Sequence, residues 1–509
     1  MRALGRLAVT GLLCSLVVSA SGSLANADPA ENTGGTGPVT GDSALDRGPF
    51  EAGSASFCIV DPSRPWDSAG GILDGQRVII VEAWYPVAPG FGRNPGARRA
   101  IFGDYFAGDP GLLLRTETDL LVTSGFSQAI VDANTPIAQA QFAVARGSFR
   151  DAPFADGHYP VVLYSHGTLQ QRFTNDSAAE NLARHGYIVL SPEHTGNDPL
   201  APLGAYCGRK LEAPGVVPAS LASNSRWDAV TGEYLGETYN PFFLVGSPDP
   251  ATGTINPVEV ALTLDRVGDY RAALGWAKRE LADHVAIGPD SVAIVGYSRG
   301  AMHGVVGAEI IPEIRGTVAI VGGTPTRFYV RDAQAQPINA ALAEATGGRR
   351  TVLDHVTKPV LDIIGGEDTR RKATTELAAE IGVYPTPTAD DPSPIVEDTF
   401  SHSTGFAELV KIEPMDHYDL VDDPFVLSFD DGGVYTAMAA QGNATRPDAW
   451  VSTETYVSLP VETRKAIRDH YLLAAIDFLI GGDAQRVARG ARAIATNPFA
   501  ADGVTVSVR

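Results

Sequence analysis

Short apolar runs rich in β-branched residues alternate with helix-like segments along most of this chain, and this alternation constrains the fold more than any other feature. The runs that predict strands lie at 77–85, 160–164, 187–190, 291–295, 316–321, 359–364 and 406–412. Helical patterns lie at 175–184, 258–282, 301–313 and 461–480, and that at 258–282 is amphipathic. Because buried parallel strands read as nearly continuous apolar runs, the sequence predicts an α/β fold with a mostly parallel sheet flanked by helices.

The alternation breaks between residues 197 and 256. This stretch is rich in glycine and proline, carries aromatic residues from Tyr206 to Phe243, and has no helix or strand period. A stretch of this length without regular structure is usually functional or an insertion. We therefore expect one domain at 51–509 with a long loop-rich insertion at about 197–256.

The amino terminus has the pattern of a secretory signal. Arg2 and Arg6 precede an apolar run at 7–18. Residues 24–27 then read Leu-Ala-Asn-Ala, which has the small residues expected at a cleavage site. The run is too short to span a bilayer comfortably, which disfavours a membrane anchor. We expect a signal peptide at 1–27 that is cleaved near Ala27, a flexible lead-in at 28–50, and an extracellular or periplasmic protein.

Acidic side chains dominate the mature chain. Cleavage near Ala27 would remove two of the 39 basic residues and none of the 60 acidic ones, leaving a net charge of −23. Such a surface repels phosphate backbones and anionic membranes, so we expect no nucleic-acid partner. No later segment is apolar enough to be a membrane anchor, and no metal or dinucleotide motif is found, so no cofactor is expected.

Two cysteines, Cys58 and Cys207, remain after the signal peptide. In an oxidising compartment a lone pair most often forms one disulfide, and we expect that bridge. Two separate buried thiols are the alternative.

A candidate nucleophile follows the apolar run at 291–295. Residues 296–300 read Gly-Tyr-Ser-Arg-Gly, which is G-x-S-x-G at the junction of a predicted strand and a predicted helix. In so glycine-rich a chain the five residues alone are weak evidence, and the strand before them and the helix after them carry the argument. The context predicts a tight turn that exposes the Ser298 hydroxyl at the end of the sheet.

A serine hydroxyl needs a base, and the base needs an orienting acid. The expected chain order is serine, acid, histidine. His417 lies in a loop after the predicted strand at 406–412 and is our candidate base, with His402 as the alternative. His303 lies inside the nucleophile's own helix, His355 precedes the strand that should deliver the acid, and His470 is expected on the surface of the last helix.

The acid is expected in the loop that follows the predicted strand at 359–364, from which a carboxylate can reach the far nitrogen of the histidine. Asp368 is the candidate, Glu367 is its close rival, and Asp362 is less suitable because it lies within the strand. The negatively charged oxygen of a tetrahedral intermediate needs two N–H donors. Arg299 follows the nucleophile and is expected to supply one, and Thr168, after His166-Gly167, is expected to supply the other.

Four segments resemble the platelet-activating-factor acetylhydrolase and dienelactone-hydrolase-like esterases. They are 78–86, 159–168, 182–194 and 296–300, in the order and spacing of those families. The resemblance implies an α/β-hydrolase fold and carboxylesterase activity, with roles for Ser298, His417, Thr168 and Arg299. Dienelactone hydrolases proper carry cysteine where this chain has Ser298. The acetylhydrolases place their acid after the strand that follows the nucleophile helix. The corresponding residues here, 320–324, contain no carboxylate. We therefore assign the acid to Asp368, and the substrate specificity of the acetylhydrolases does not transfer to this chain.

These observations predict a secreted serine hydrolase that cleaves lipid or other small acyl esters through an acyl-enzyme. An amidase or peptidase with the same triad and a catalytically silent binding protein of the same fold are the alternatives. We expect the aromatic insertion to cover an apolar acyl pocket. The alternative is that it faces solvent and only packs on the core. The natural ester and the oligomeric state stay open.

Overall fold

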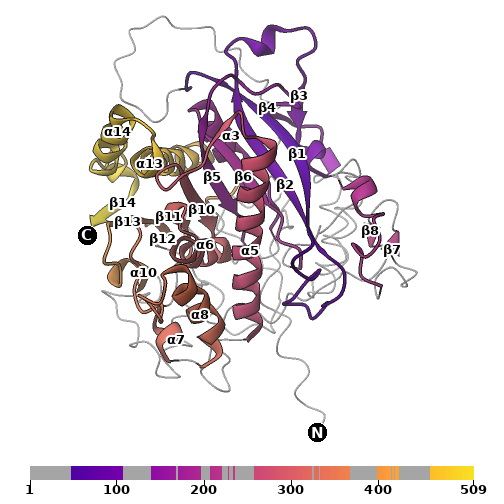
Figure 1. Ribbon diagram of the computed structural model, residues 1–509. Coiled ribbons are helices and arrows are strands. Elements are labelled where there is room, and N and C mark those ends of the chain that lie inside the picture. The colour runs from indigo at the N-terminus through magenta and orange to yellow at the C-terminus, as the bar shows by residue number, and fades with distance from the viewer. Residues whose placement is uncertain are drawn as a thin grey trace, which may run out of the picture.

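A twelve-stranded sheet forms the centre of the part of the chain that the structure describes (Figure 1). The structure is a computed structural model, and it describes residues 47–106, 139–140, 142–167, 170–196, 207–219, 227–228, 233–234, 257–323, 326–331, 333–366, 398–413, 415, 417, 419–422 and 459–509. The predicted signal peptide and most of the predicted insertion lie outside these residues.

The sheet is parallel in its middle, and its outer pairs are antiparallel except for the parallel pair of β1 and β4. Its strands run in the order β14-β13-β12-β11-β10-β5-β6-β2-β1-β4-β3, and β9 pairs with β5. The strands from β6 through β5 and β10 to β13 pair in parallel, whereas β2 and β14 flank them in antiparallel register. The strand bounds are β1 Glu51–Asp61, β2 Arg77–Val87, β3 Arg99–Ile101, β4 Ala145–Arg150, β5 Tyr159–Ser165, β6 Ile188–Pro192, β9 Val285–Ala286, β10 Val292–Tyr297, β11 Ile314–Ile320, β12 Val360–Gly365, β13 Ala407–Ile412 and β14 Val504–Val508.

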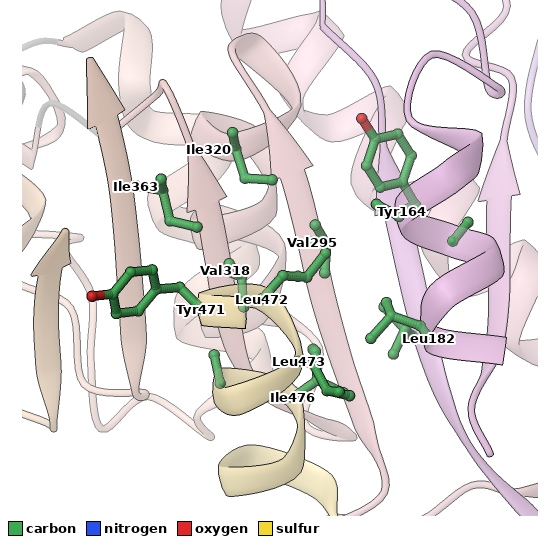
Figure 2. Packing of buried hydrophobic residues seen from close by; sticks show 14 of the residues in the cluster. Tyr164, Leu182, Val295, Val318, Ile320, Ile363, Tyr471, Leu472, Leu473 and Ile476 are labelled. Carbon is green, nitrogen blue, oxygen red and sulfur yellow. The ribbon is translucent and has the colours of Figure 1, made fainter. Parts of the chain in front are cut away.

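Helices cover both faces of this sheet. Alternate residues of each central strand point to opposite faces, so Val295 and Val318 pack under α13 (Val461–Ile480) and α3 (Asp176–Arg184) on one face. Figure 2 shows Leu472 and Ile476 of α13 over these strands. The other face is covered by α5 (Pro257–Glu280), α6 (Arg299–Ile310) and α8 (Gln336–Ala345). The predicted fold class is confirmed.

Smaller elements complete the described residues. They are α7 (Thr326–Arg331), α10 (Asp398–Ser401), α14 (Ala484–Ile494), the antiparallel pair of β7 (Trp227–Asp228) and β8 (Glu233–Tyr234), and the short 3-10 helices η1 (Phe91–Arg93), η2 (Phe102–Phe106), η3 (Gly208–Lys210), η4 (Ala333–Ala335) and η6 (Ala500–Asp502).

The sequence patterns missed the outer strands and the helices α7, α8, α10 and α14. β1 pairs with β2 along its whole length although its sequence mixes small and polar residues, and the outer strands β3, β4 and β14 were also not expected. One surface assignment is wrong, because His470 is 7 % exposed and its ring packs against Tyr471 and Phe499. Edge strands and late helices gain their stability from tertiary contacts, which a local pattern does not carry.

Helix α5 differs from the expected amphipathic helix because charged side chains on it are buried. Its bounds agree with the prediction, but Glu259, Arg266 and Asp269 are at most 2 % exposed. Buried charges cost free energy unless they are paired. The polar face of α5 is therefore an internal face, and its partners define its role.

Cys58 and Cys207 form a disulfide. It joins β1 to the start of the described segment 207–219, which packs on Trp66, Val78 and Ile80. The bridge closes a loop over a sequence separation of 149 residues.

Replacing both cysteines with alanine is expected to lower the free energy of unfolding by about 3–5 kcal/mol, because loop-closure entropy then returns to the unfolded chain. Urea unfolding of the two proteins measures the difference. Dithiothreitol should destabilise the wild-type protein and leave the double variant unchanged. An equal effect of the reductant on both proteins would contradict this account.

Glu408, on β13, is a buried carboxyl group with 0 % exposure. No group among the described residues donates a hydrogen bond to either of its carboxyl oxygens. Burial raises the pKa of Glu408 from 4.5 to about 8. The folded protein therefore holds this proton where the unfolded chain releases it, so the contribution of Glu408 to stability falls as the pH rises from about 4.5 through about 8.

Glu408→Gln is expected to remove this pH dependence. At pH 5 the variant and the wild-type protein should have similar free energies of unfolding, because both side chains are then neutral. At pH 9 the variant should be more stable by on the order of 3 kcal/mol. Urea unfolding at both pH values measures the difference between the proteins. The exposed, ion-paired Glu413 provides the control variant Glu413→Gln. A difference that does not grow with pH would contradict the assignment.

Candidate active site

The candidate nucleophile stands on a strained turn between β10 and α6. Ser298 has φ +53° and ψ −118°, a conformation that side-chain-bearing residues rarely adopt. A Cβ atom on Gly296 would lie 2.3 Å from the Gly300 carbonyl oxygen, and one on Gly300 would lie 2.0 Å from the Ser165 carbonyl oxygen. Both glycines of G-x-S-x-G are therefore required sterically. Ser298 itself is partly exposed, so a substrate can approach it.

His417 lies beside the serine. Its Nε2 is 2.9 Å from Ser298 Oγ, and the imidazole is 4 % exposed in the loop after β13. The hydroxyl of Tyr297, the residue before the serine, donates a hydrogen bond to the backbone carbonyl of His417. The turn that carries the candidate nucleophile thus also holds the loop that carries the candidate base.

The other histidines stand elsewhere. The carbonyl of His402 accepts a hydrogen bond from the Val356 N–H, 3.0 Å away. Val356 precedes β12 and His402 precedes β13 in the chain. His402 and His355 therefore lie towards the amino-terminal ends of the parallel strands, whereas Ser298 lies at a carboxyl-terminal end. His303 is buried and faces Glu259. Among the candidate bases, the structure brings only His417 to Ser298 within the described residues.

Asp368 and its rival Glu367 lie outside the described residues. Strand β12, which precedes them, is described. Just past its end, the Gly366 N–H donates a hydrogen bond to the Ile412 carbonyl oxygen, 2.9 Å away at the end of β13. The chain therefore leaves β12 next to the strand whose following loop carries His417. Asp362 is buried within β12, as its sequence position suggested.

The expected oxyanion donors come from two segments that touch. Arg299 is the first residue of α6, where amide N–H groups point out of the helix end. Thr168 lies outside the described residues, but the preceding His166 and Gly167 are described. The Gly167 N–H donates to Gln170 Oε1 at 2.9 Å and is therefore engaged. In the register of β5 with β10, Ser165 lies beside Gly296.

A second serine–histidine–aspartate arrangement, which the sequence did not reveal, lies beneath this loop. Ser165 Oγ is 3.1 Å from His194 Nε2, and His194 Nδ1 is 3.0 Å from Asp269 Oδ2. All three side chains are fully buried. Ser165 Oγ also accepts hydrogen bonds from Tyr270 and Arg266, so its own proton points to His194 and its lone pairs are engaged. Such an oxygen is inaccessible and a poor nucleophile, and the arrangement is structural.

Burial and the positive charge of Arg266 lower the pKa of His194 to about 3, although the hydrogen bond to Asp269 opposes this shift. His194 is therefore neutral and can accept the Ser165 proton. A bidentate ion pair with Arg77 neutralises Asp269, with both N–O distances at 2.7 Å. The Glu-His pair at 193–194 was visible in the sequence, but Asp269 lies 75 residues from His194 and nothing local connects them.

Another buried group connects α5 to the turn at Ser298. Glu259 Oε2 is 3.3 Å from Arg299 Nη2, and Glu259 Oε1 is 2.7 Å from His303 Nε2. Burial alone would raise the pKa of Glu259, but the Arg299 charge and the His303 hydrogen bond lower it to about 2. The carboxylate is therefore ionised and anchors the Arg299 side chain.

Neither a metal site nor a membrane span is found in the parts of the chain that the structure describes. No cluster there holds three or more His, Cys, Asp or Glu side chains in a metal-binding arrangement. None of the described helices combines the length and apolarity needed to cross a bilayer.

The sheet, the helices on its faces and the serine turn after β10 define an α/β-hydrolase fold. The family model of platelet-activating factor acetylhydrolase, isoform II, matches residues 129–214, which contain β4 to β6 and the described His166-Gly167 pair. A ferulic acid esterase from Streptomyces cinnamoneus is similar in structure, with a TM-score of 0.50 and 17 % sequence identity over 90 % of this chain and 96 % of that one. No curated protein matches the sequence. These findings confirm the predicted fold and the resemblance to the acetylhydrolase family.

Proposed function

We propose that this protein is a serine hydrolase that cleaves carboxylic esters through an acyl-enzyme. The single observation that carries the proposal is the 2.9 Å contact between Ser298 Oγ and His417 Nε2 on the strained, accessible turn after β10. A serine on such a turn exposes its hydroxyl to a substrate, and a histidine at that distance can take the hydroxyl proton. The acetylhydrolase family match and the esterase neighbour support ester hydrolysis as the reaction.

The reaction proceeds in two halves. Ser298 Oγ attacks the ester carbonyl carbon while His417 Nε2 takes the hydroxyl proton. The amides of Arg299 and Thr168 stabilise the negative carbonyl oxygen. The tetrahedral intermediate then expels the alcohol, which receives the proton from His417. Water repeats the sequence on the acyl-enzyme and releases the carboxylic acid and free Ser298.

Asp368 completes the proposed triad by accepting a hydrogen bond from the second nitrogen of His417, and it stabilises the imidazolium that forms. The adjacency of the ends of β12 and β13 supports this role. Glu367 is the alternative acid.

The proposed substrates are lipid or other small acyl esters, with the insertion at 197–256 as the roof of the acyl pocket. The disulfide supports export of the chain, because such bridges persist in oxidising compartments. We accordingly propose a signal peptide at 1–27 and an extracellular or periplasmic location.

A fluorophosphonate probe tests the reaction class. It should label the wild-type protein on the peptide that contains Ser298 and should not label Ser298→Ala. Activity on p-nitrophenyl acetate and palmitate, beside the corresponding p-nitroanilides, then separates an esterase from an amidase and reports acyl length. Equal labelling of Ser298→Ala, or no labelling of the wild-type protein, would overturn the enzymatic assignment in favour of a binding protein. Faster cleavage of the anilides would favour an amidase.

A further inference from the structure

Two buried, charged side chains of helix α5 contact the two segments that carry the proposed oxyanion donors. Glu259 and Arg266 are seven residues apart, close to two helical turns, so they lie on one face of α5. Both side chains are almost fully buried. Since an unpaired charge in such a place is costly, the partners of these two residues are held strongly.

Arg266 binds the backbone that follows β5. Its Nη1 donates to the His166 carbonyl oxygen at 2.5 Å and to Ser165 Oγ at 3.1 Å, and its Nη2 donates to the Gly167 carbonyl oxygen at 3.4 Å. The Gly167 carbonyl also accepts from His166 Nδ1 at 2.8 Å. Two successive carbonyl groups are therefore fixed by one planar guanidinium.

The position of the Gly167 carbonyl has a direct consequence for the next amide. A peptide group is planar, so the carbonyl of Gly167 and the N–H that follows it share one plane. That N–H is the donor proposed for the oxyanion hole. An oxyanion hole accelerates a reaction only if its donors are oriented before the charge develops.

Glu259 acts on the other segment. Its carboxylate lies 3.3 Å from Arg299 Nη2 and accepts from His303 at 2.7 Å, and both partners belong to the first turns of α6. The Arg299 amide is the second proposed donor. One face of α5 thus contacts both segments from which the donors come.

We propose that α5 is a positioning element for catalysis, in which Arg266 holds the His166-Gly167 backbone and Glu259 holds the Arg299 side chain, so that the two segments that carry the proposed oxyanion donors keep their places relative to each other. This inference rests on the proposed esterase function. Neither side chain touches the substrate. Their effect reaches the reaction through the backbone of the β5 loop and through the Arg299 side chain at the nucleophile turn.

The test uses Arg266→Lys, which keeps the charge but cannot bridge two carbonyls and a hydroxyl, and Glu259→Gln, which keeps the shape and loses the charge. The matched control is Arg150→Lys, because Arg150 is a buried arginine that pairs with Glu82 and Ser56 on the outer strands. The measurements are kcat and KM for p-nitrophenyl butyrate, the inhibition constant of a trifluoromethyl ketone with the same acyl chain, and the melting temperature.

Arg266→Lys is expected to lower kcat roughly 10- to 100-fold with little change in KM, since a misplaced donor weakens only the transition state. The trifluoromethyl ketone forms an oxyanion on Ser298, so its inhibition constant should rise by about the same factor. Glu259→Gln should have a smaller effect of the same kind. Arg150→Lys should leave kcat and the inhibition constant unchanged even if its melting temperature falls.

Unchanged kcat in both α5 variants would overturn the inference while the esterase function stands. The same conclusion follows if kcat falls in Arg150→Lys as much as in Arg266→Lys, or if the inhibition constant does not follow kcat. A wild-type protein that cleaves no ester would overturn the proposed function, and the inference with it.

Discussion

Replacing Ser298 with alanine is expected to lower kcat for ester hydrolysis by about 10⁵- to 10⁶-fold, and His417→Ala should cost nearly as much. In the proposed mechanism the two side chains act as one unit, because a single proton passes from the serine to the histidine across their 2.9 Å contact. The double variant should therefore be no slower than Ser298→Ala. Steady-state kcat for a p-nitrophenyl ester, measured on all three proteins, checks this.

The control for His417 is His402→Ala. His402 was the alternative base in the sequence, and the described residues place it towards the opposite ends of the strands. Its replacement should change kcat by less than about 3-fold, in the range of a substitution away from the site. Loss of activity in His402→Ala with retention in His417→Ala would show that the wrong histidine has been assigned.

Asp368→Asn is expected to lower kcat by about 10³- to 10⁴-fold, because an amide in place of the carboxylate no longer stabilises the imidazolium or selects the required tautomer. Glu367→Gln should change kcat by less than about 3-fold if Asp368 alone holds the histidine. Both variants exchange a carboxylate for its amide, so they differ in position and not in chemistry. The measurement is kcat with saturating ester.

The reverse result, with Glu367→Gln inactive and Asp368→Asn active, would transfer the role to Glu367. Asp362→Asn tests the third acid that the sequence offered. Asp362 is fully buried in β12, so its replacement should affect the melting temperature more than kcat.

The two serine–histidine pairs in this molecule show why contact geometry alone does not identify a nucleophile. Ser165 and His194 are 3.1 Å apart and Ser298 and His417 are 2.9 Å apart. Only Ser298 is accessible and stands on a strained turn. Ser165 instead accepts two hydrogen bonds in a closed interior.

Prediction from sequence succeeded where a local pattern determines the structure. The central strands were found because burial on both faces demands continuous apolar runs, and the turn at Ser298 was found because it requires small residues at fixed offsets. It failed at β1 and β14, where pairing partners supply the stability, and at His470, whose burial depends on the ring of Phe499.

The sequence by itself determined the strand–helix alternation, the candidate nucleophile and the short set of histidines and acids from which its partners come, because period, chain order and spacing are properties of the chain. Only the tertiary structure decided which histidine meets Ser298 and where the charges of α5 lie. His417 reaches the serine from 119 residues away, and Arg266 reaches the carbonyls after β5 from about 100. Contacts at such separations are set by how the strands and helices pack, and packing depends on the whole chain.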